Sequence, residues 1–228
     1  MKTHIKLCLL TIIWFFLLVS CKQKSNYLDL YAGKMIPFDD SMFPKNLSKV
    51  DFLQTWSKLM GLPRLDSGNF NSYIRVWIWD YNANYLMNLE KNGQKWDASI
   101  YKIGSKDSPK GKYIVVDSVW LNLVPVDGWD EFNQKIEINN LFMLQGGTPP
   151  KQLPTTLTTM SSVEIEINNK GNYKMVQYYE PNYFKKLKDG SSVVDKFLIF
   201  CKNQFRVDMY FISDKFYEPK IDSTKNSN

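Results

Sequence analysis

The chain has 228 residues, with 29 lysine and arginine side chains, 23 aspartate and glutamate side chains and one histidine. This length suits one domain or two small ones, and a composition that is 44% apolar and 23% charged excludes a wholly disordered chain. The histidine, His4, lies in a segment that we expect to be removed. Histidine-dependent triads, cysteine–histidine catalysis and imidazole zinc sites are therefore excluded from the mature protein.

A basic start and a short apolar run occupy the first twenty residues. Lys2 and Lys6 carry the positive charge, and residues 7–19 are apolar or nearly so. As a helix this run spans roughly 20 Å, which is less than the ~30 Å hydrocarbon core of a bilayer. The pattern therefore predicts a cleaved signal peptide over residues 1–20.

The apolar run ends in Leu18, Val19, Ser20 and Cys21. These four residues resemble the lipobox of bacterial lipoprotein precursors. The resemblance implies that the Cys21 sulfur receives a diacylglycerol, that the Ser20–Cys21 bond is cleaved, and that the new amino group is acylated, for example with palmitate. Each buried methylene contributes about 0.8 kcal/mol, so several chains would anchor the protein firmly. The alternatives are an ordinary secretory signal with a chance cysteine, or an uncleaved anchor.

In its composition, its lipobox and the pattern of its predicted strands, the chain also resembles the small, aromatic- and asparagine-rich lipoproteins of Bacteroidota. Those bacteria often mark surface lipoproteins with acidic residues after the cysteine, whereas residues 22–25 here are KQKS. The position after Cys21 is also not the aspartate that retains lipoproteins in the inner membrane of other Gram-negative bacteria. We therefore expect a lipid anchor in the outer membrane, with the domain on the periplasmic side of the cell envelope.

The charge and the cysteine content indicate which binding partners and which disulfide bonds can be expected. The formal net charge is +6, but arginine occurs only at Arg64, Arg75 and Arg206. Nucleic-acid binding usually needs clustered arginine, so we expect no nucleic-acid partner. Cys8 lies in the signal peptide and Cys21 carries lipid, which leaves Cys201 without a disulfide partner. Its apolar neighbours predict a small buried thiol.

Three helices are expected in the remaining chain. Residues 48–60 have apolar positions at helical spacing, with Ser48 and Asp51 as a capping box and Gly61 as the terminating residue. Residues 128–144 predict a second helix with Asp127 as its cap. A third helix is expected from a cap at Ser191 or Ser192 to about residue 204. Its inward positions would be Val194, Phe197, Leu198, Cys201 and Phe205.

Alternating segments predict strands between these helices. Residues 70–124 indicate a meander of about four strands, with a tight turn at residues 91–94. Two more strands flank a turn at residues 169–171, and residues 206–213 are compatible with a short last strand. The fold class expected is α+β, an antiparallel sheet of about six strands with about three packed helices. Residues 21–45 would form a lipidated tether, 46–213 a single domain and 214–228 a flexible tail.

Motifs for chemistry are weak. Phosphate-binding glycine loops, HExxH, CxxC and GxSxG do not occur, and no cofactor or metal is expected. Asp80 opens a calcium-loop pattern, but Tyr85 replaces the required glycine and Lys91 the required acid. The carboxylate pairs left for acid–base catalysis are Asp39 with Asp40, Asp130 with Glu131, and Glu164 with Glu166. Glu164 and Glu166 share one strand face, which suits a two-carboxylate hydrolase, but a solvated face gives the same pattern.

Aromatic residues supply a second candidate site. The strip holds Tyr73, Trp77, Trp79, Trp96, Tyr101 and Trp120. Exposed on the surface, Trp77, Trp79 and Trp96 would stack on sugar rings or anchor a protein interface; buried, they would fill the core. We therefore expect a non-enzymatic, membrane-anchored lipoprotein that binds an unidentified protein or glycan. The alternatives are an immunity-type lipoprotein that neutralises a toxin, and a carbohydrate-binding or carbohydrate-hydrolysing envelope protein.

Overall fold

The computed structural model describes residues 34–80, 84–93, 95–109, 111–136, 138–146, 161–179, 190–207 and 209. Its strands are β1 (Lys34–Phe38), β2 (Ser72–Trp79), β3 (Asn84–Asn92), β4 (Lys95–Ser108), β5 (Gly111–Trp120), β6 (Ser162–Asn169) and β7 (Asn172–Tyr179). Its helices are α2 (Lys49–Leu59), α3 (Gly128–Lys135), α4 (Ile138–Met143) and α5 (Ser191–Phe205), with a 3-10 turn η1 (Asp40–Met42). Cys21, most of the predicted strand 206–213 and the tail 214–228 lie outside the described residues.

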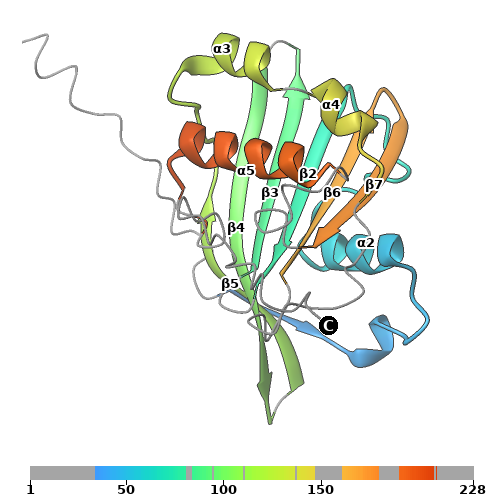
Figure 1. The fold of residues 1–228 in the computed structure, drawn as a ribbon. Helices are drawn as coiled ribbons and strands as arrows, with labels where there is room; N and C mark the ends of the chain where they lie inside the picture. The colour runs from blue at the N-terminus through green and yellow to red at the C-terminus, as the bar shows by residue number, and fades with distance from the viewer. Residues whose placement is uncertain are drawn as a thin grey trace, which may run out of the picture.

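The strands form one antiparallel sheet in the order β1-β5-β4-β3-β2-β6-β7 (Figure 1). The predicted α+β class is confirmed, and so is the meander, which is β2 to β5. Among the described residues the sheet has seven strands rather than about six. The hairpin of β6 and β7 turns through Lys170 and Gly171, both with positive φ, and extends the sheet beyond β2.

The extra strand comes from the predicted tether. β1 pairs with β5 from Lys34 opposite Val116 to Phe38 opposite Lys112. Ile36 and Phe38 pack against the cluster of buried side chains beneath α2. The predicted domain start at residue 46 is therefore wrong, because the sheet already includes residues 34–38.

The helix predicted over residues 48–60 is confirmed as α2. The Ser48 hydroxyl accepts a hydrogen bond from the Asp51 backbone N–H at 3.1 Å and donates to the Asp51 carboxylate at 2.6 Å. The predicted cap of Ser48 with Asp51 is therefore found, and both of these hydrogen bonds are made by the Ser48 hydroxyl. Gly61 follows with φ of +71°, which is the left-handed conformation that ends many helices.

The helix predicted over residues 128–144 is divided into α3 and α4. Ile136 adopts an extended conformation, which interrupts the helical backbone. Asp127 occupies the N-cap of α3 but makes no capping bond, because its carboxylate accepts hydrogen bonds from Gln204 and Lys135 instead. The N-cap of α5 is Gly190 rather than either predicted serine.

The two faces of the sheet are covered by different helices. Figure 1 shows α5, with α3 and α4 beside it, on one face and α2 on the other. Ile74, Val76 and Ile78 of β2 belong to the core under α5, whereas Trp77 belongs to the core under α2. The five predicted inward positions of α5 are all buried, and Cys201 is a buried free thiol whose pKa is raised by burial. Both faces of β2 are therefore covered.

We expect Gly190→Ala to destabilise the protein by about 2–4 kcal/mol. Gly190 has φ of +94°, and an added Cβ would lie 2.6 Å from the buried Tyr178 hydroxyl and 2.7 Å from Leu144 Cδ2. Gly61→Ala is the matched control, because its φ is also positive but no atom lies within 4 Å of the added Cβ. We expect that control to lose only about 1 kcal/mol of unfolding free energy in chemical denaturation. Equal losses in the two variants would contradict this account of close packing.

Candidate functional site

Charged and polar side chains are buried between α2 and the sheet. They are Gln54, Ser57, Arg75, Asn88, Glu164, Glu166 and Asn168. Alternation along β6 places the carboxylates on this face, while Val163, Ile165 and Ile167 belong to the core under α5. The prediction that Glu164 and Glu166 share a face is confirmed. Their interpretation as a solvated face is wrong, because both side chains are 0% exposed.

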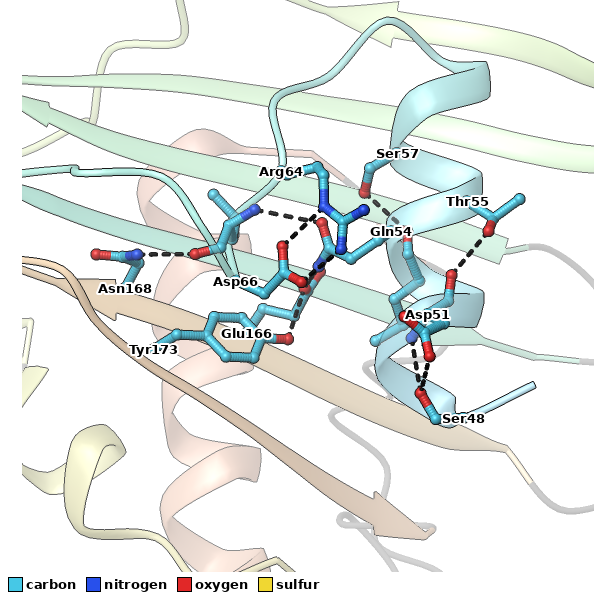
Figure 2. A network of polar contacts seen from close by, with 12 residues as sticks. Ser48, Asp51, Gln54, Thr55, Ser57, Arg64, Asp66, Glu166, Asn168 and Tyr173 are labelled. Carbon is cyan, nitrogen blue, oxygen red and sulfur yellow. Dashed lines mark hydrogen bonds and ion pairs between the residues drawn. The ribbon is translucent and has the colours of Figure 1, made fainter. Parts of the chain in front are cut away.

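Glu166 is the centre of this polar cluster. One carboxylate oxygen accepts hydrogen bonds from Gln54 Nε2 and from the Tyr173 hydroxyl, the latter at 3.0 Å (Figure 2). The other oxygen accepts from Trp77 Nε1 at 2.8 Å and lies 3.8 Å from Arg75 NH1. Both oxygens are therefore occupied by groups of the protein itself.

The buried Arg75 guanidinium has a partner for each of its nitrogens. Nε donates to Asn88 Oδ1 at 2.9 Å, NH1 to Ser57 Oγ at 2.7 Å and NH2 to the Pro63 carbonyl at 3.0 Å. A buried cation is stable only when such partners replace water. Because Ser57 belongs to α2 and Pro63 to the loop after it, Arg75 connects both of these segments to β2.

The loop after α2 is bound from two sides. Asn168 on β6 donates to the carbonyls of Leu65 and Gly68 at 2.7 and 2.8 Å. The Leu65 backbone N–H donates to Gln54 Oε1 at 3.2 Å, so Gln54 connects Glu166 to this loop (Figure 2). The cluster thus fixes α2 and residues 61–68 against β2 and β6, which is a structural role.

Burial dominates the titration of this cluster. The pKa of Glu166 is raised above its ordinary value of 4.5 by burial, against the opposing effects of Arg75 and the hydrogen bonds from Trp77, Tyr173 and Gln54. The pKa of Tyr173 is also raised by burial and by the neighbouring Glu166. Tyr173 is therefore a neutral hydrogen-bond donor at physiological pH.

Glu164 lies nearer the N-terminus of α2 and is less completely bonded. Its Oε1 accepts from Lys49 Nζ at 2.8 Å, Gln177 Nε2 at 2.7 Å and Ser162 Oγ at 3.0 Å. In the described part of the chain, Oε2 of Glu164 and Nε1 of Trp79 are buried without a hydrogen-bond partner. This carboxylate also fixes α2 to the sheet, and it keeps one oxygen available as an acceptor.

The predicted aromatic binding surface is not formed. Trp77 and Trp96 are 0% and 1% exposed, and they belong to the cores on opposite faces of the sheet. Trp79 is partly buried, with its ring stacked on Trp77 at 5.6 Å between centroids and further contacts to Phe52 and Trp56. The Trp96 indole N–H donates to Asn133 at 2.6 Å. These tryptophans fill the two cores, as the alternative interpretation expects.

The other predicted acidic positions lie near the surface and have local roles. Asp39 accepts from the Ser41 backbone N–H at 2.7 Å, and Asp40 forms an ion pair with Lys112 at 2.6 Å. Glu131 pairs with Lys135 one helical turn away, at 3.0 Å. The Asp80 carboxylate accepts from Ser161 at 2.7 Å, while residues 81–83 of the rejected calcium loop lie outside the described residues.

A cavity of about 420 Å³ lies on the opposite side of the sheet, between α5 and the segment that contains the end of α3 and α4. Its lining residues are Lys135, Asn140, Leu141, Val193, Lys196, Phe197 and Phe200. Its volume is within the range of small-molecule pockets, and its lining combines four apolar side chains with three polar or charged ones. The arrangement suits a ligand with an apolar body and a polar end.

Sequence reasoning missed this cavity. Val193, Phe197 and Phe200 recur at helical spacing, which predicts core packing and says nothing about a space beside the helix. Lys196 interrupts this apolar stripe, and a charged residue at such a position indicates that the stripe reaches solvent. In the structure Lys196 is exposed and lines the cavity. The wall of the cavity opposite α5 includes Asn140 and Leu141 of α4. The position of α4 follows from the extended backbone of Ile136, which ends α3.

No known protein family, curated protein or solved structure has significant similarity to this chain. Over the described ranges, no three or more histidine, cysteine or acidic residues are grouped as metal ligands would be. Nor does a helix in those ranges combine the length and apolar character needed to cross a membrane.

The raised pKa of Glu166 predicts a pH-dependent stability. Because the folded state holds this proton more tightly, the stabilisation is complete below about pH 4.5 and declines as pH rises through the folded pKa. We expect urea unfolding from pH 4 upward to show this decline in the unmodified protein and its loss in Glu166→Gln. Glu131→Gln, which removes an exposed carboxylate, should keep the contribution of Glu166. An identical pH profile for Glu166→Gln and the unmodified protein would contradict the assignment.

Proposed function

We propose that this protein is a lipid-anchored lipoprotein of the bacterial cell envelope, and that its α+β domain is a non-enzymatic binding module. The cavity between α5 and the α3–α4 segment carries the proposal, because it combines an apolar wall with polar groups at its rim. The proposed anchor is the lipid on Cys21, in the outer membrane and with the domain in the periplasm. That part is supported by the lipobox residues Leu18 to Cys21.

The contacts of the carboxylates support binding over hydrolysis. A two-carboxylate hydrolase needs an acid and a base that reach the substrate. Glu166 has both oxygens bonded by protein groups, and Glu164 is bonded by Lys49, Gln177 and Ser162. Both side chains are fully buried beneath α2. Their contacts serve to hold this helix on the sheet.

The burial of the tryptophans weakens the carbohydrate alternative. Sugar binding by stacking needs an accessible aromatic face. Trp77 and Trp96 are buried, and Trp79 is packed against Trp77, Phe52 and Trp56. A glycan partner would therefore need a different surface, so we favour a small ligand in the cavity.

The anchor is tested by Cys21→Ser, with Cys8→Ser in the apolar run as the matched control. We expect Cys21→Ser to abolish incorporation of labelled fatty acid and to release the protein from washed envelopes, because serine lacks the sulfur that carries the lipid. Cys8→Ser should keep both properties. Membrane association and lipid labelling that persist in Cys21→Ser would exclude this anchor.

The binding site is tested by filling the cavity. Val193 lines it and is partly buried, so we expect Val193→Trp to expel the ligand, whereas Val124→Trp changes a valine that is 57% exposed. Native mass spectrometry of protein purified from envelopes should show an added small-molecule mass in the unmodified protein and in Val124→Trp. That mass should be absent from Val193→Trp. Retention of the same mass in Val193→Trp, or no added mass in any sample, would contradict the proposed site.

A further inference from the structure

We propose that the cavity between α5 and the α3–α4 segment binds a single-chain anionic amphiphile, such as a free fatty acid. The apolar chain would lie along α5, and the carboxylate would lie at Lys196. This inference rests on the proposed binding function and adds the chemical class of the ligand.

The wall of the cavity explains the apolar part of the ligand. Val193, Phe197 and Phe200 form one stripe of α5, and Leu141 of α4 faces them across the cavity. Phe200 is held in place because its ring stacks on the buried Phe132 at 5.3 Å between centroids. Apolar chains gain about 25 cal/mol for each Å² removed from water, so such a wall favours an aliphatic body.

The charges at the rim explain the anionic head. Lys135 is already neutralised by Asp127 and Glu131, whose carboxylates lie 3.3 and 3.0 Å from its Nζ. Lys196 also lines the cavity, is exposed, and has no ion-pair partner among the described side chains, so it is the lysine to which we assign the anionic head.

Two further features of α5 affect the electrostatic potential near Lys196. Asp195, the chain neighbour of Lys196, is buried on the core side of the helix. The first turn of α5 contains no acidic residue, so the positive end of the helix dipole is not offset there. Lys196 is therefore the charge at the cavity rim with which an anionic head would pair, whereas a neutral head would form no ion pair with it and a cationic head would be repelled by it.

The experiment uses the full lipidated protein in vesicles of zwitterionic phosphatidylcholine. The probe is a medium-chain fatty acid with a diazirine near its methyl end, and the neutral comparison is the corresponding alcohol. After photolysis, peptides are mapped by mass spectrometry. We expect the acid to label peptides from α4 or α5 about tenfold more than the alcohol does, because an ion pair beside an apolar wall is partly desolvated.

Lys196→Glu should lower labelling by the acid about tenfold and leave labelling by the alcohol unchanged. Lys95→Glu is the matched control, because it makes the same charge reversal at an exposed position on β4, and it should label like the unmodified protein. Lys196 is exposed, so its replacement does not disturb the core. The comparison of acid with alcohol uses the unmodified protein, so it does not depend on how any variant folds.

Equal labelling by acid and alcohol would overturn the inference, and so would labelling by the acid that survives Lys196→Glu or lies outside α4 and α5. In any of these cases, native mass spectrometry of the unmodified protein can still show a bound small molecule that Val193→Trp loses. The cavity then remains a binding site, and only the ligand class is wrong. If that molecule is also absent, the proposed function fails with the inference.

Discussion

The contact between the buried Arg75 guanidinium and the buried Glu166 carboxylate decides where α2 lies. Removing either charge from water costs several kcal/mol, and the attraction between them offsets this only when further hydrogen bonds complete both groups. Those bonds come from Gln54 and Ser57 of α2, from Pro63, and from the sheet. A shift of α2 along the sheet would break several of them at once. The hydrogen bonds that α2 and its following loop make to this pair thus make one position of the helix strongly preferred over others.

The two faces of the sheet are packed by different kinds of contacts. Under α2 the contacts combine aromatic rings with hydrogen-bonded polar groups, which have directional preferences. Under α5 the core consists mainly of aliphatic and aromatic side chains, which pack without such directions. The cavity lies on this second side, beside the point at which the extended backbone of Ile136 ends α3 ahead of α4. The polar contacts therefore hold α2 in place, and the apolar face contains the cavity of the proposed binding site.

Local signals in the sequence predicted local structure well. The Ser48–Asp51 cap, the glycine turns and the alternation of β2 each depend on neighbouring residues, and each is found in the structure. β1 was missed because KMIPF is short and contains proline, and its partner strand is about eighty residues away in the chain. Alternation along β6 correctly placed Glu164 and Glu166 on one face. Their burial could not be predicted, because it depends on a helix more than a hundred residues earlier.

The edge position of β1 has a mechanical consequence for an anchored protein. Lys34 lies thirteen positions after Cys21, and even a fully extended chain of that length reaches only about 45 Å. In the described part of the chain, a pull from the proposed lipid on Cys21 would act first on Lys34, the first residue of β1. Directed along the strand, this force would load the ladder between β1 and β5 in shear, so that its hydrogen bonds share the strain. Directed sideways, it would open the same ladder one residue pair at a time.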